Sequence, residues 1–287
     1  MKSIYTVVDD IYSTVERKDG WFSDAIANNL STNIVRSLQG QLGQPRTARL
    51  RLSQMGPRCP KALWHSIHTP ELSEPLPPWA EIKYSYGHIL EALVISLAKA
   101  AGHDVQGEQD EVSVDGILGH RDCVLDGCIC DVKSASSRSY QKFKTGSIKD
   151  DDGFGYLDQL DGYILGSLHD PLVTVKDRGY LLAIDKTLGH MCIYEHILRE
   201  RSIRDRVAAY REIVSRTISP TCECGTRPQG KSGNIELDMR ASYNDFKYVC
   251  FPNLRTFLYA SGPTYLTTVV RKPDVIEIDK HGKVVYN

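Results

Sequence analysis

The sequence has no apolar run that approaches the roughly 18 residues needed to cross a membrane. Its first residues, MKSIYTVVDDIYS, lack the apolar core of a secretory signal peptide. We find no internal repeat and no low-complexity segment. From these absences we expect a soluble protein of the cytoplasm, with no contact to a membrane.

An excess of basic charge is also missing, since 35 basic and 36 acidic residues give a formal net charge of −1. Any nucleic-acid site must therefore come from local clustering of lysine and arginine. With 41% hydrophobic and 25% charged residues over 287 positions, the composition is that of a globular chain with a sizeable core. Eight cysteines in a cytosolic chain favour free thiols or metal ligands over disulfides.

Residues 119–133, GHRDCVLDGCICDVK, predict two short strands joined by a turn at Asp126-Gly127. Side chains two apart on a strand point to the same face, so Asp131 and Lys133 share one, while Asp122 lies on the other arm. Two carboxylates can bind a hard divalent cation, and a lysine beside them can hold a water or neutralise charge on a phosphate. The pattern indicates metal-dependent phosphodiester hydrolysis; a hairpin with solvated charges is the alternative.

A helix is expected over residues 79–101, because apolar side chains recur at helical spacing. The stripe comprises Ile89, Leu90, Leu93, Val94 and Leu97. Glu91 lies between residues of this stripe, and a carboxylate near a core costs free energy unless it is paired or bound to a cation. Glu91 is therefore a further candidate ligand, unless it turns outward at the edge of the stripe.

The rest of the chain indicates a coarse order of elements. Residues 1–42 are expected to form a helical packing arm, and on a helix over 155–168 the residues Gln159 and Tyr163, four apart, share a face. Further expectations are strands at 110–114, 117–124 and 127–134, a hairpin of 179–185 with 190–195, a charged helix over 196–216, a loop-like stretch over 217–244, a partly helical stretch over 245–260, and closing strands at 275–278 and 284–286.

Two stretches are locally basic. Residues 44–63 contain no acidic residue and precede Trp64, and residues 134–149 form an expected loop without acidic residues, in which Tyr140 and Phe143 are interleaved. The basic residues are Arg46, Arg49, Arg51, Arg58 and Lys61 in the first stretch, and Arg138, Lys142, Lys144 and Lys149 in the second. Such basic stretches with interleaved aromatic residues are typical of nucleic-acid-binding surfaces, and we expect Tyr140 to be one of the contacts to nucleic acid. The alternative is that both stretches are solvated charged faces.

Residues 225–232, GTRPQGKS, match the phosphate-binding loop pattern G-x4-G-K-S letter for letter. That loop needs a buried strand before it and a helix after it, so that backbone N–H groups surround the phosphate. The flanking residues 219–224 and 233–234 supply neither. We therefore expect a glycine-rich loop; an enzyme that hydrolyses nucleotides would need Lys231.

In combination, these motifs resemble a known family. A helix carrying Glu91, Gly-His-x-Asp at 119–122, Asp-x-Lys at 131–133 and Gln-x3-Tyr at 159–163 are similar to the PD-(D/E)XK nuclease superfamily, above all to its RecB-like branch of phage exonucleases and CRISPR-associated nucleases. The resemblance covers Leu50 to about Val275. It implies an α/β fold with a central mixed β-sheet flanked by helices, which is a restriction-endonuclease-like core with an N-terminal helical arm and a C-terminal extension.

The resemblance also implies a role for each residue of the set. The implied ligands of Mg²⁺ or Mn²⁺ are Glu91, Asp122, Asp131 and the carbonyl of Val132. Lys133 would be the catalytic lysine, which with the metal activates water for in-line attack on a phosphodiester. Gln159 and Tyr163 would orient the substrate strand and the site.

The cysteines depart from the family pattern. Related nucleases often carry Cys-x2-Cys-x5-Cys near the end, which joins an N-terminal cysteine to hold a four-iron, four-sulfur cluster. Residues 55–64, MGPRCPKALW, resemble the N-terminal segment and supply Cys59, but Ala241 and Asn244 stand at two of the later positions, and Cys250 alone remains.

A cluster needs four thiolates, and Cys222 and Cys224 look a poor replacement in a flexible loop. We therefore expect that the iron–sulfur cluster was lost, that Cys59 and Cys250 are its residual ligands, and that packing replaced it. Three other cysteines, Cys123, Cys128 and Cys130, are expected to be small core residues.

The sequence predicts an N-terminal helical arm and basic segment over 1–78, a nuclease core over 79–216, and an extension packing on the core over 217–287. Residues 253–259 with Gly262-Pro263 look most like phage exonucleases. We therefore expect a metal-dependent DNA exonuclease, phage-encoded, for recombination, replication or breakdown of DNA in the host cytoplasm. DNA ends or single strands are the expected partners, with a single-strand-binding or annealing protein besides. An endonuclease of the same fold and an inactive nucleic-acid-binding module are the alternatives.

Overall fold

A five-stranded mixed sheet, in the order β1-β4-β5-β6-β7, is the centre of the computed structural model, which describes residues 2–18, 20–41, 48–76 and 78–286. Strands β5 and β6 pair in parallel, and the other neighbours are antiparallel. The strands are β1 (Val105–Gln106), β4 (Cys123–Leu125), β5 (Cys128–Ala135), β6 (Val175–Asp185) and β7 (Met191–Ile197). The predicted α/β class, with a mixed sheet flanked by helices, is confirmed.

The chain divides into two compact units. Unit 1 comprises Met1–Pro45, Leu50–Gly56 and Leu76–Val207, and unit 2 comprises Arg46–Arg49, Pro57–Pro75 and Ala208–Asn287. The α-helices of unit 1 are α1 (Val7–Val15), α2 (Asp24–Gln41), α4 (Pro78–Ala100), α5 (Ser137–Thr145) and α6 (Tyr156–Gly166), and α7 (Glu200–Ser215) crosses the boundary. Short 3-10 turns occur at Ile4–Thr6, Leu52–Gln54, Pro70–Leu72 and Ser147–Lys149.

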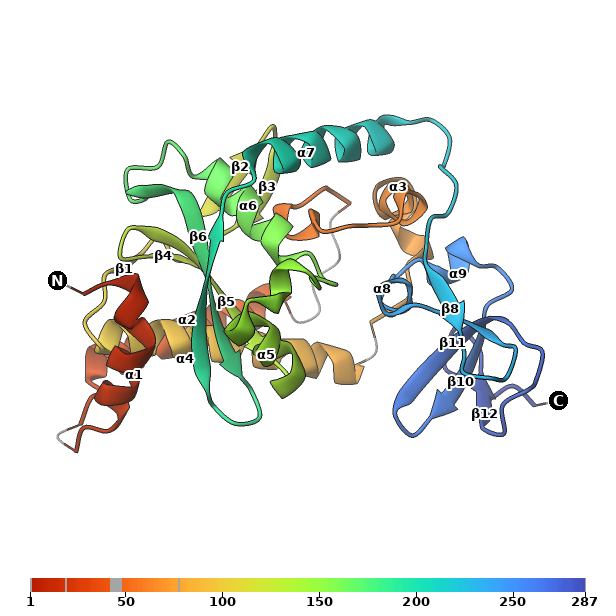
Figure 1. Cartoon of the computed structure of the whole chain (residues 1–287), viewed down its shortest axis with the longest axis horizontal. Coiled ribbons are helices and arrows are strands. Elements are labelled where there is room, and N and C mark those ends of the chain that lie inside the picture. Colours follow the sequence, from red (N-terminus) through yellow and green to blue (C-terminus); the bar gives the residue numbers. More distant parts are fainter. Residues whose placement is uncertain (1, 19, 42–47, 77, 287) are drawn as a thin grey trace. The chain divides into compact units, whose positions relative to one another are not determined.

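Helices cover both faces of the central sheet. Alternate residues of β5 from Cys128 to Val132 join a buried cluster with side chains of α1 and α4. The opposite face meets α6, since a Cβ added to Gly179 of β6 would come within 3.0 Å of Leu160 and Ile164. Strands β5 and β6 therefore lie between α4 and α6 (Figure 1).

Three of the cysteines confirm their expected role in this core. Cys123, Cys128 and Cys130 are buried within the cluster that α1 and α4 form with the sheet. Since Asp131 alternates with Cys130 along β5, the Asp131 side chain points to the other face, toward α6.

Unit 2 contains a second sheet, in the order β12-β10-β11-β9-β8, whose pairs are all antiparallel. Its elements are α3 (Pro60–His68), β8 (Thr226–Pro228), β9 (Ile235–Leu237), α8 (Met239–Ser242), α9 (Lys247–Cys250), β10 (Arg255–Tyr259), β11 (Gly262–Thr268) and β12 (Ile276–Ile278). Residues 225–232 lie in the β8–β9 hairpin, without the strand–loop–helix context of a phosphate-binding loop.

The strand expected over 117–124 divides in two. Its first part, β3 (Ile117–His120), pairs with β2 (Glu111–Val114) in a separate two-stranded sheet, and its second part is β4. The break falls at Arg121 and Asp122, whose side chains have polar partners described below. Alternation of apolar residues did not reveal it, because residues 119–122, Gly-His-Arg-Asp, contain no apolar side chain.

Two expected loops contain regular structure. Within 134–149 the structure has α5, which begins after Ser136, whose Oγ accepts a hydrogen bond from Ser139 N–H, and ends at Gly146 with φ of 75°. The stretch 217–244 contains β8, β9 and α8. No helix among the described residues is long and apolar enough to span a bilayer.

Candidate active site

A two-residue turn fixes the β4–β5 hairpin. Asp126 and Gly127 both have positive φ, 50° and 78°, as the tight turns that match strand twist require. The Asp126 carboxylate lies 2.7 Å from His103 Nδ1. A Cβ at Gly127 would lie 2.2 Å from Thr174 Oγ1, so glycine is needed there. The turn sets the register of β4 against β5, as the sequence predicted.

Asp131 is the most enclosed acid of the site. Its side chain is 1% exposed, and the Lys133 ammonium lies against its Oδ2 as an ion pair on the same face of β5. Apart from this Lys133 contact at Oδ2, neither Asp131 oxygen accepts a hydrogen bond from an N–H or O–H donor among the described residues. A buried carboxylate with unfilled acceptor positions is costly, and a bound cation would relieve that cost.

Asp122 lies between β3 and β4 and reaches the neighbouring strand. Its Oδ2 accepts a hydrogen bond of 2.7 Å from Val132 N–H. Burial raises the pKa of Asp122, and the negative charges of Asp131 and Glu91 raise it further. Burial also raises the pKa of Asp131, although Lys133 opposes this effect. Acids that raise the pKa of a neighbour mark a site that is short of positive charge.

Lys133 connects the strand to α6. Its ammonium lies 3.5 Å from Gln159 Oε1 and 5.0 Å from the ring centre of Tyr156. Gln159 Nε2 donates a hydrogen bond of 2.8 Å to the Tyr163 hydroxyl, so these two residues share a face of α6. Burial alone would lower the pKa of Lys133, but the adjacent carboxylates outweigh burial and raise it.

A polar network that sequence reasoning missed fixes α6 itself. Asp161 is fully buried, and its carboxylate accepts hydrogen bonds from Arg199 N–H at 3.0 Å and Arg199 Nε at 2.8 Å. His196 Nε2 lies 2.8 Å from Asp161 Oδ1. The network holds the helix that carries Gln159 and Tyr163 to the end of β7.

Glu91 lies on α4 at the edge of the site. Its carboxylate accepts a hydrogen bond of 2.6 Å from Gln109 Nε2 and lies 3.6 Å from His88 Nδ1. Its charge acts on Asp122 and Asp131, whose pKa values it raises. Glu91 is thus electrostatically coupled to the two aspartates while its oxygens contact other side chains.

Arg121, next to Asp122, is a second residue that sequence reasoning missed. It is 1% exposed, and its guanidinium forms ion pairs with Asp110 at 3.0 Å and Asp170 at 2.6 Å. Arg121 Nη1 also lies 3.3 Å from Ser167 Oγ. Because buried charges are retained only when paired, these contacts fix the chain at the β3–β4 break and with it the Asp122 backbone.

The basic residues of 134–149 lie on or beside α5. Arg138 and Lys144 are exposed, whereas Lys142 pairs with Asp151 at 2.5 Å. Tyr140 is 2% exposed, and its hydroxyl donates a hydrogen bond of 3.0 Å to the Met191 carbonyl. The prediction that Tyr140 contacts nucleic acid is therefore corrected, because a ring packed in the core cannot stack on a base.

The first basic stretch is divided between the units. Arg51 belongs to unit 1, and Arg49, Arg58 and Lys61 belong to unit 2. Arg49 and Arg58 are exposed, and Arg51 and Lys61 are half-buried. Arg46 lies outside the described residues. Contact of these residues with nucleic acid remains a prediction.

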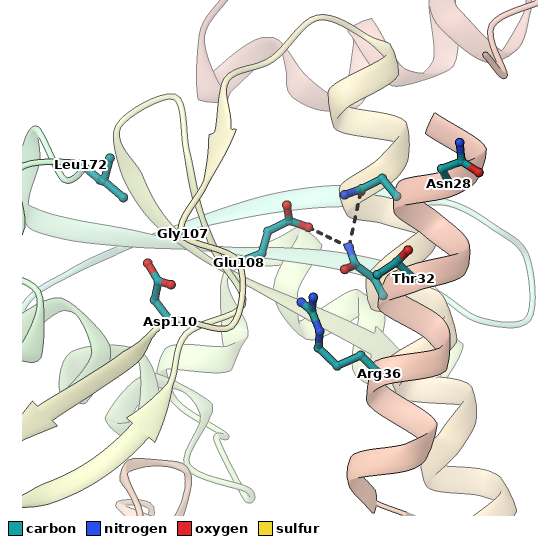
Figure 2. A pocket seen from close by; sticks show the side chains of 9 residues that line it. Asn28, Thr32, Arg36, Gly107, Glu108, Asp110 and Leu172 are labelled. Atoms are coloured by element: carbon teal, nitrogen blue, oxygen red, sulfur yellow. Dashed lines mark hydrogen bonds between the residues drawn. The ribbon is translucent and has the colours of Figure 1, made fainter. Parts of the chain in front are cut away.

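A polar pocket lies between α2 and the loop that follows β1 (Figure 2). Glu108 reaches across it and accepts a hydrogen bond of 2.9 Å from Asn33 Nδ2. The Lys99 ammonium contacts the other oxygen of Glu108 and lies 3.0 Å from Asn29 Oδ1. These contacts tie α2 to α4 and to the loop, so we assign the pocket lining a packing role.

Sulfur ligands gather in unit 2. The Sγ atoms of Cys59, Cys222, Cys224 and Cys250 all lie within 4.8 Å of one another. The fold thus brings Cys222 and Cys224 to Cys59 and Cys250, which the expected flexible loop did not indicate. That this pair is a poor replacement for the missing ligands of an iron–sulfur cluster stays a prediction. Within the described residues, the four cysteines are the sole group of acidic, histidine or cysteine ligands so tightly gathered.

The donors of the Asp122–Asp131 site fit a hard divalent cation. Carboxylate oxygens are the ligands that Mg²⁺ and Mn²⁺ prefer. Asp131, whose Oδ2 contacts the Lys133 ammonium, has acceptor positions left for such an ion. The three carboxylates are spread more widely than the cysteine sulfurs. Like charges repel one another, and a cation between them would remove that repulsion.

No protein-family model and no curated protein matches the chain. Among solved structures, SSO0001 is 16% identical, with 80% of this chain and 97% of that chain covered and a TM-score of 0.41. A phage-related exonuclease from Haemophilus somnus 129PT is 14% identical (58% and 93% covered, TM-score 0.40). LHK-Exo from Laribacter hongkongensis, in complex with dAMP, is 13% identical (58% and 88% covered, TM-score 0.38). Two of these three proteins are exonucleases.

Proposed function

We propose that the chain is a Mg²⁺- or Mn²⁺-dependent deoxyribonuclease that hydrolyses phosphodiester bonds, acting as an exonuclease. The observation that carries the proposal is Asp131, buried with unfilled oxygens beside the Lys133 ammonium and close to Asp122. A hairpin with solvated charges would leave these side chains in water and would not enclose them. Enclosed, opposed charges are typical of catalytic sites.

Asp122 and Asp131 are the proposed ligands, with Glu91 as the third carboxylate and the Val132 carbonyl as a further oxygen. When bound, a divalent cation supplies Lewis-acid charge on the phosphate and lowers the pKa of water. Val132 N–H holds the Asp122 carboxylate, and Asp122 spans two strands through that bond. The ligands are thus oriented by the backbone of the central sheet, which is a rigid support.

Lys133 contributes a positive charge and N–H donors beside the carboxylates. Hydrolysis adds a water oxygen to phosphorus and breaks the bond to one ester oxygen, which leaves with a proton. Charge builds on the phosphate oxygens during this exchange, and the ammonium of Lys133 stabilises it. Gln159 Oε1 accepts a hydrogen bond of 3.5 Å from the Lys133 ammonium, and Gln159 Nε2 donates one to the Tyr163 hydroxyl. Gln159 and Tyr163 together therefore orient the ammonium.

The exposed Arg138 and Lys144 are the proposed contacts to the phosphates of a DNA strand, because they follow the Asp131–Lys133 strand directly in the chain. Lys142 and Arg51, also of unit 1, are proposed to add to these contacts. Arg49, Arg58 and Lys61 of unit 2 are proposed as a separate set of contacts to nucleic acid. The resemblance of residues 253–259 to phage exonucleases favours an exonuclease and a phage source over an endonuclease.

Cleavage assays on linear duplex DNA, labelled separately at each end, test the proposal beside a closed circle, with Mg²⁺, Mn²⁺ or chelator. Lys133→Ala is the test variant, and Lys176→Ala, at an exposed lysine of β6 outside the site, is its control. We expect release of label from linear DNA alone, lost in Lys133→Ala and retained in Lys176→Ala, and the released end gives the polarity.

Two other outcomes are decisive. Cutting of the closed circle would assign an endonuclease with the same site. Absence of cleavage with either metal, by a folded protein that still binds DNA, would sink the enzyme proposal and leave a nucleic-acid-binding module.

A further inference from the structure

The four cysteine sulfurs of unit 2 have the spacing of ligands around a single ion. Cys59 Sγ lies 3.8 Å from Cys222 Sγ and 3.9 Å from Cys250 Sγ. Metal–sulfur bonds of about 2.3 Å at tetrahedral angles place two sulfurs roughly 3.8 Å apart. The cysteines are free, since a disulfide would need a separation of about 2.05 Å.

A four-iron cluster does not fit this arrangement. In such a cluster each thiolate binds a different iron, so the thiolate sulfurs stand considerably farther apart than ligands that share one ion. Four sulfurs within 4.8 Å of one another leave no room for four irons and four sulfides between them. The spacing of these sulfurs is therefore incompatible with the four-iron cluster of related nucleases, although the number of cysteines is again four.

N–H donors surround the sulfurs. Asn244 Nδ2 lies 3.3 Å from Cys224 Sγ and 3.6 Å from Cys250 Sγ. The backbone N–H of Glu223 points to Cys59 Sγ at 3.4 Å, and that of Cys224 points to Cys222 Sγ at the same distance. Four thiolates around a divalent ion carry a net negative charge, and such donors stabilise it.

The surroundings of the sulfurs are apolar, with Cys250 buried and the other three cysteines half-buried. Ala62 and Phe246 are buried against the cysteines, and Val249 and Phe251 pack on them. Cys59 precedes α3, Cys250 ends α9, and the other two cysteines lie in the loop after α7. With four protein ligands and no open position, such a centre is structural and does not bind substrate.

We propose that Cys59, Cys222, Cys224 and Cys250 bind one Zn²⁺ ion as a structural tetrathiolate site. Binding exchanges four S–H bonds for four Zn–S bonds and releases the protons to solvent. The ion joins three segments of unit 2 that are distant in the chain. Asn244, at a position where related nucleases carry a cysteine ligand, supports the site as a donor to two sulfurs.

The test is metal analysis of the full chain, purified without a metal-binding tag, under anaerobic and reducing conditions. We expect about one zinc per chain, negligible iron, and loss of most of the zinc in Cys224→Ser. Cys192→Ser is the control, since Cys192 is a half-buried cysteine of β7 outside the group, and it should keep its zinc. Asn244→Ala should bind zinc roughly 10- to 100-fold more weakly in competition with a chromophoric chelator.

Cobalt replacement in the wild-type chain gives an answer even if Cys224→Ser does not fold. Tetrahedral cobalt with four thiolates has intense visible and sulfur-to-metal charge-transfer bands, which we expect. Stoichiometric iron with labile sulfide would overturn the proposal in favour of a cluster. A metal-free chain whose four thiols react in the folded state, or one with these cysteines oxidised to disulfides, would also overturn it.

Discussion

The two ligand groups of this molecule are built in opposite ways. Asp122 and Asp131 of unit 1 present oxygen atoms, and within the described residues Asp131 has the Lys133 ammonium at Oδ2 and no further donor. The four sulfurs of unit 2 are gathered within 4.8 Å and each receives or neighbours an N–H donor. Unfilled acceptors suit a site that must exchange ions, water and substrate, whereas saturated ligands suit a site that must not change.

The most direct way to separate the two sites is Asp131→Asn. Removing the carboxylate charge should lower DNA cleavage by at least about a thousandfold, because both the cation and the ammonium lose their partner. The zinc content should stay within error of the wild type, since the four cysteines belong to the other unit. Cleavage rates and metal analysis of one preparation measure both.

If Asp131→Asn lost its zinc, the two sites would not be independent and the comparison would fail. Cys192→Ser serves as the control for purification and metal loading.

Arg121→Met tests how strongly the β3–β4 break depends on a buried charge. Removal of the guanidinium leaves Asp110 and Asp170 without their partner, and breaking a buried ion pair costs about 3–5 kcal/mol of unfolding free energy. Denaturant unfolding measures the loss. Arg201→Met, at a 95% exposed arginine of α7, should change stability little; an equal loss in both variants would contradict a special role for Arg121.

Asp170→Asn should have the smallest effect, and one that depends on pH. Burial raises the pKa of Asp170, but Leu172 N–H and Arg121 outweigh it and hold the pKa below its ordinary value of 3.8. The carboxylate therefore stabilises the fold by about 1–3 kcal/mol above pH 3.8, and the contribution is lost as the pH falls through the lower folded-state pKa. The difference in unfolding free energy between variant and wild type should shrink toward zero below pH 3.8.

Asp205→Asn is the matched control for this experiment. Asp205 is 76% exposed and lies 3.9 Å from Arg201, so its charge should matter little at any pH. A difference for Asp170→Asn that persisted in acid would show that packing, and not charge, accounts for its effect.

How well the sequence predicts each site depends on how far apart the residues of that site lie along the chain. Asp122, Asp131 and Lys133 come from one hairpin, and strand alternation with an Asp-Gly turn is enough to place them together. Cys59 and Cys222 are 163 residues apart, and local pattern carries no information on such a contact. The partners of Arg121 on other segments escaped prediction for the same reason.

The predictions for Tyr140 and for the loop that proved to contain α5 are wrong for a different reason. Ser136 before the helix, Gly146 after it, and Tyr140 three residues before Phe143 are the signals of a short amphipathic helix. Charge and apolar periodicity in this stretch favour different structures, and the periodicity is the one that agrees with the packing of α5. Here the information was present in the sequence, and the tyrosine is a core residue on a helix whose other face is charged.

Unit 2 takes α3 and the 3-10 turn Pro70–Leu72 from early in the chain, and its other elements from the end. On the ribosome, Cys59 therefore emerges long before its partners. At about 5–20 residues per second, the interval before Cys222 is made is roughly 10–30 s. During that time the central sheet of unit 1 can form, whereas Cys59, next to α3, does not yet have its partner cysteines. Unit 2 is thus the last unit to be completed in each new molecule, although its first helix, α3, is synthesised early.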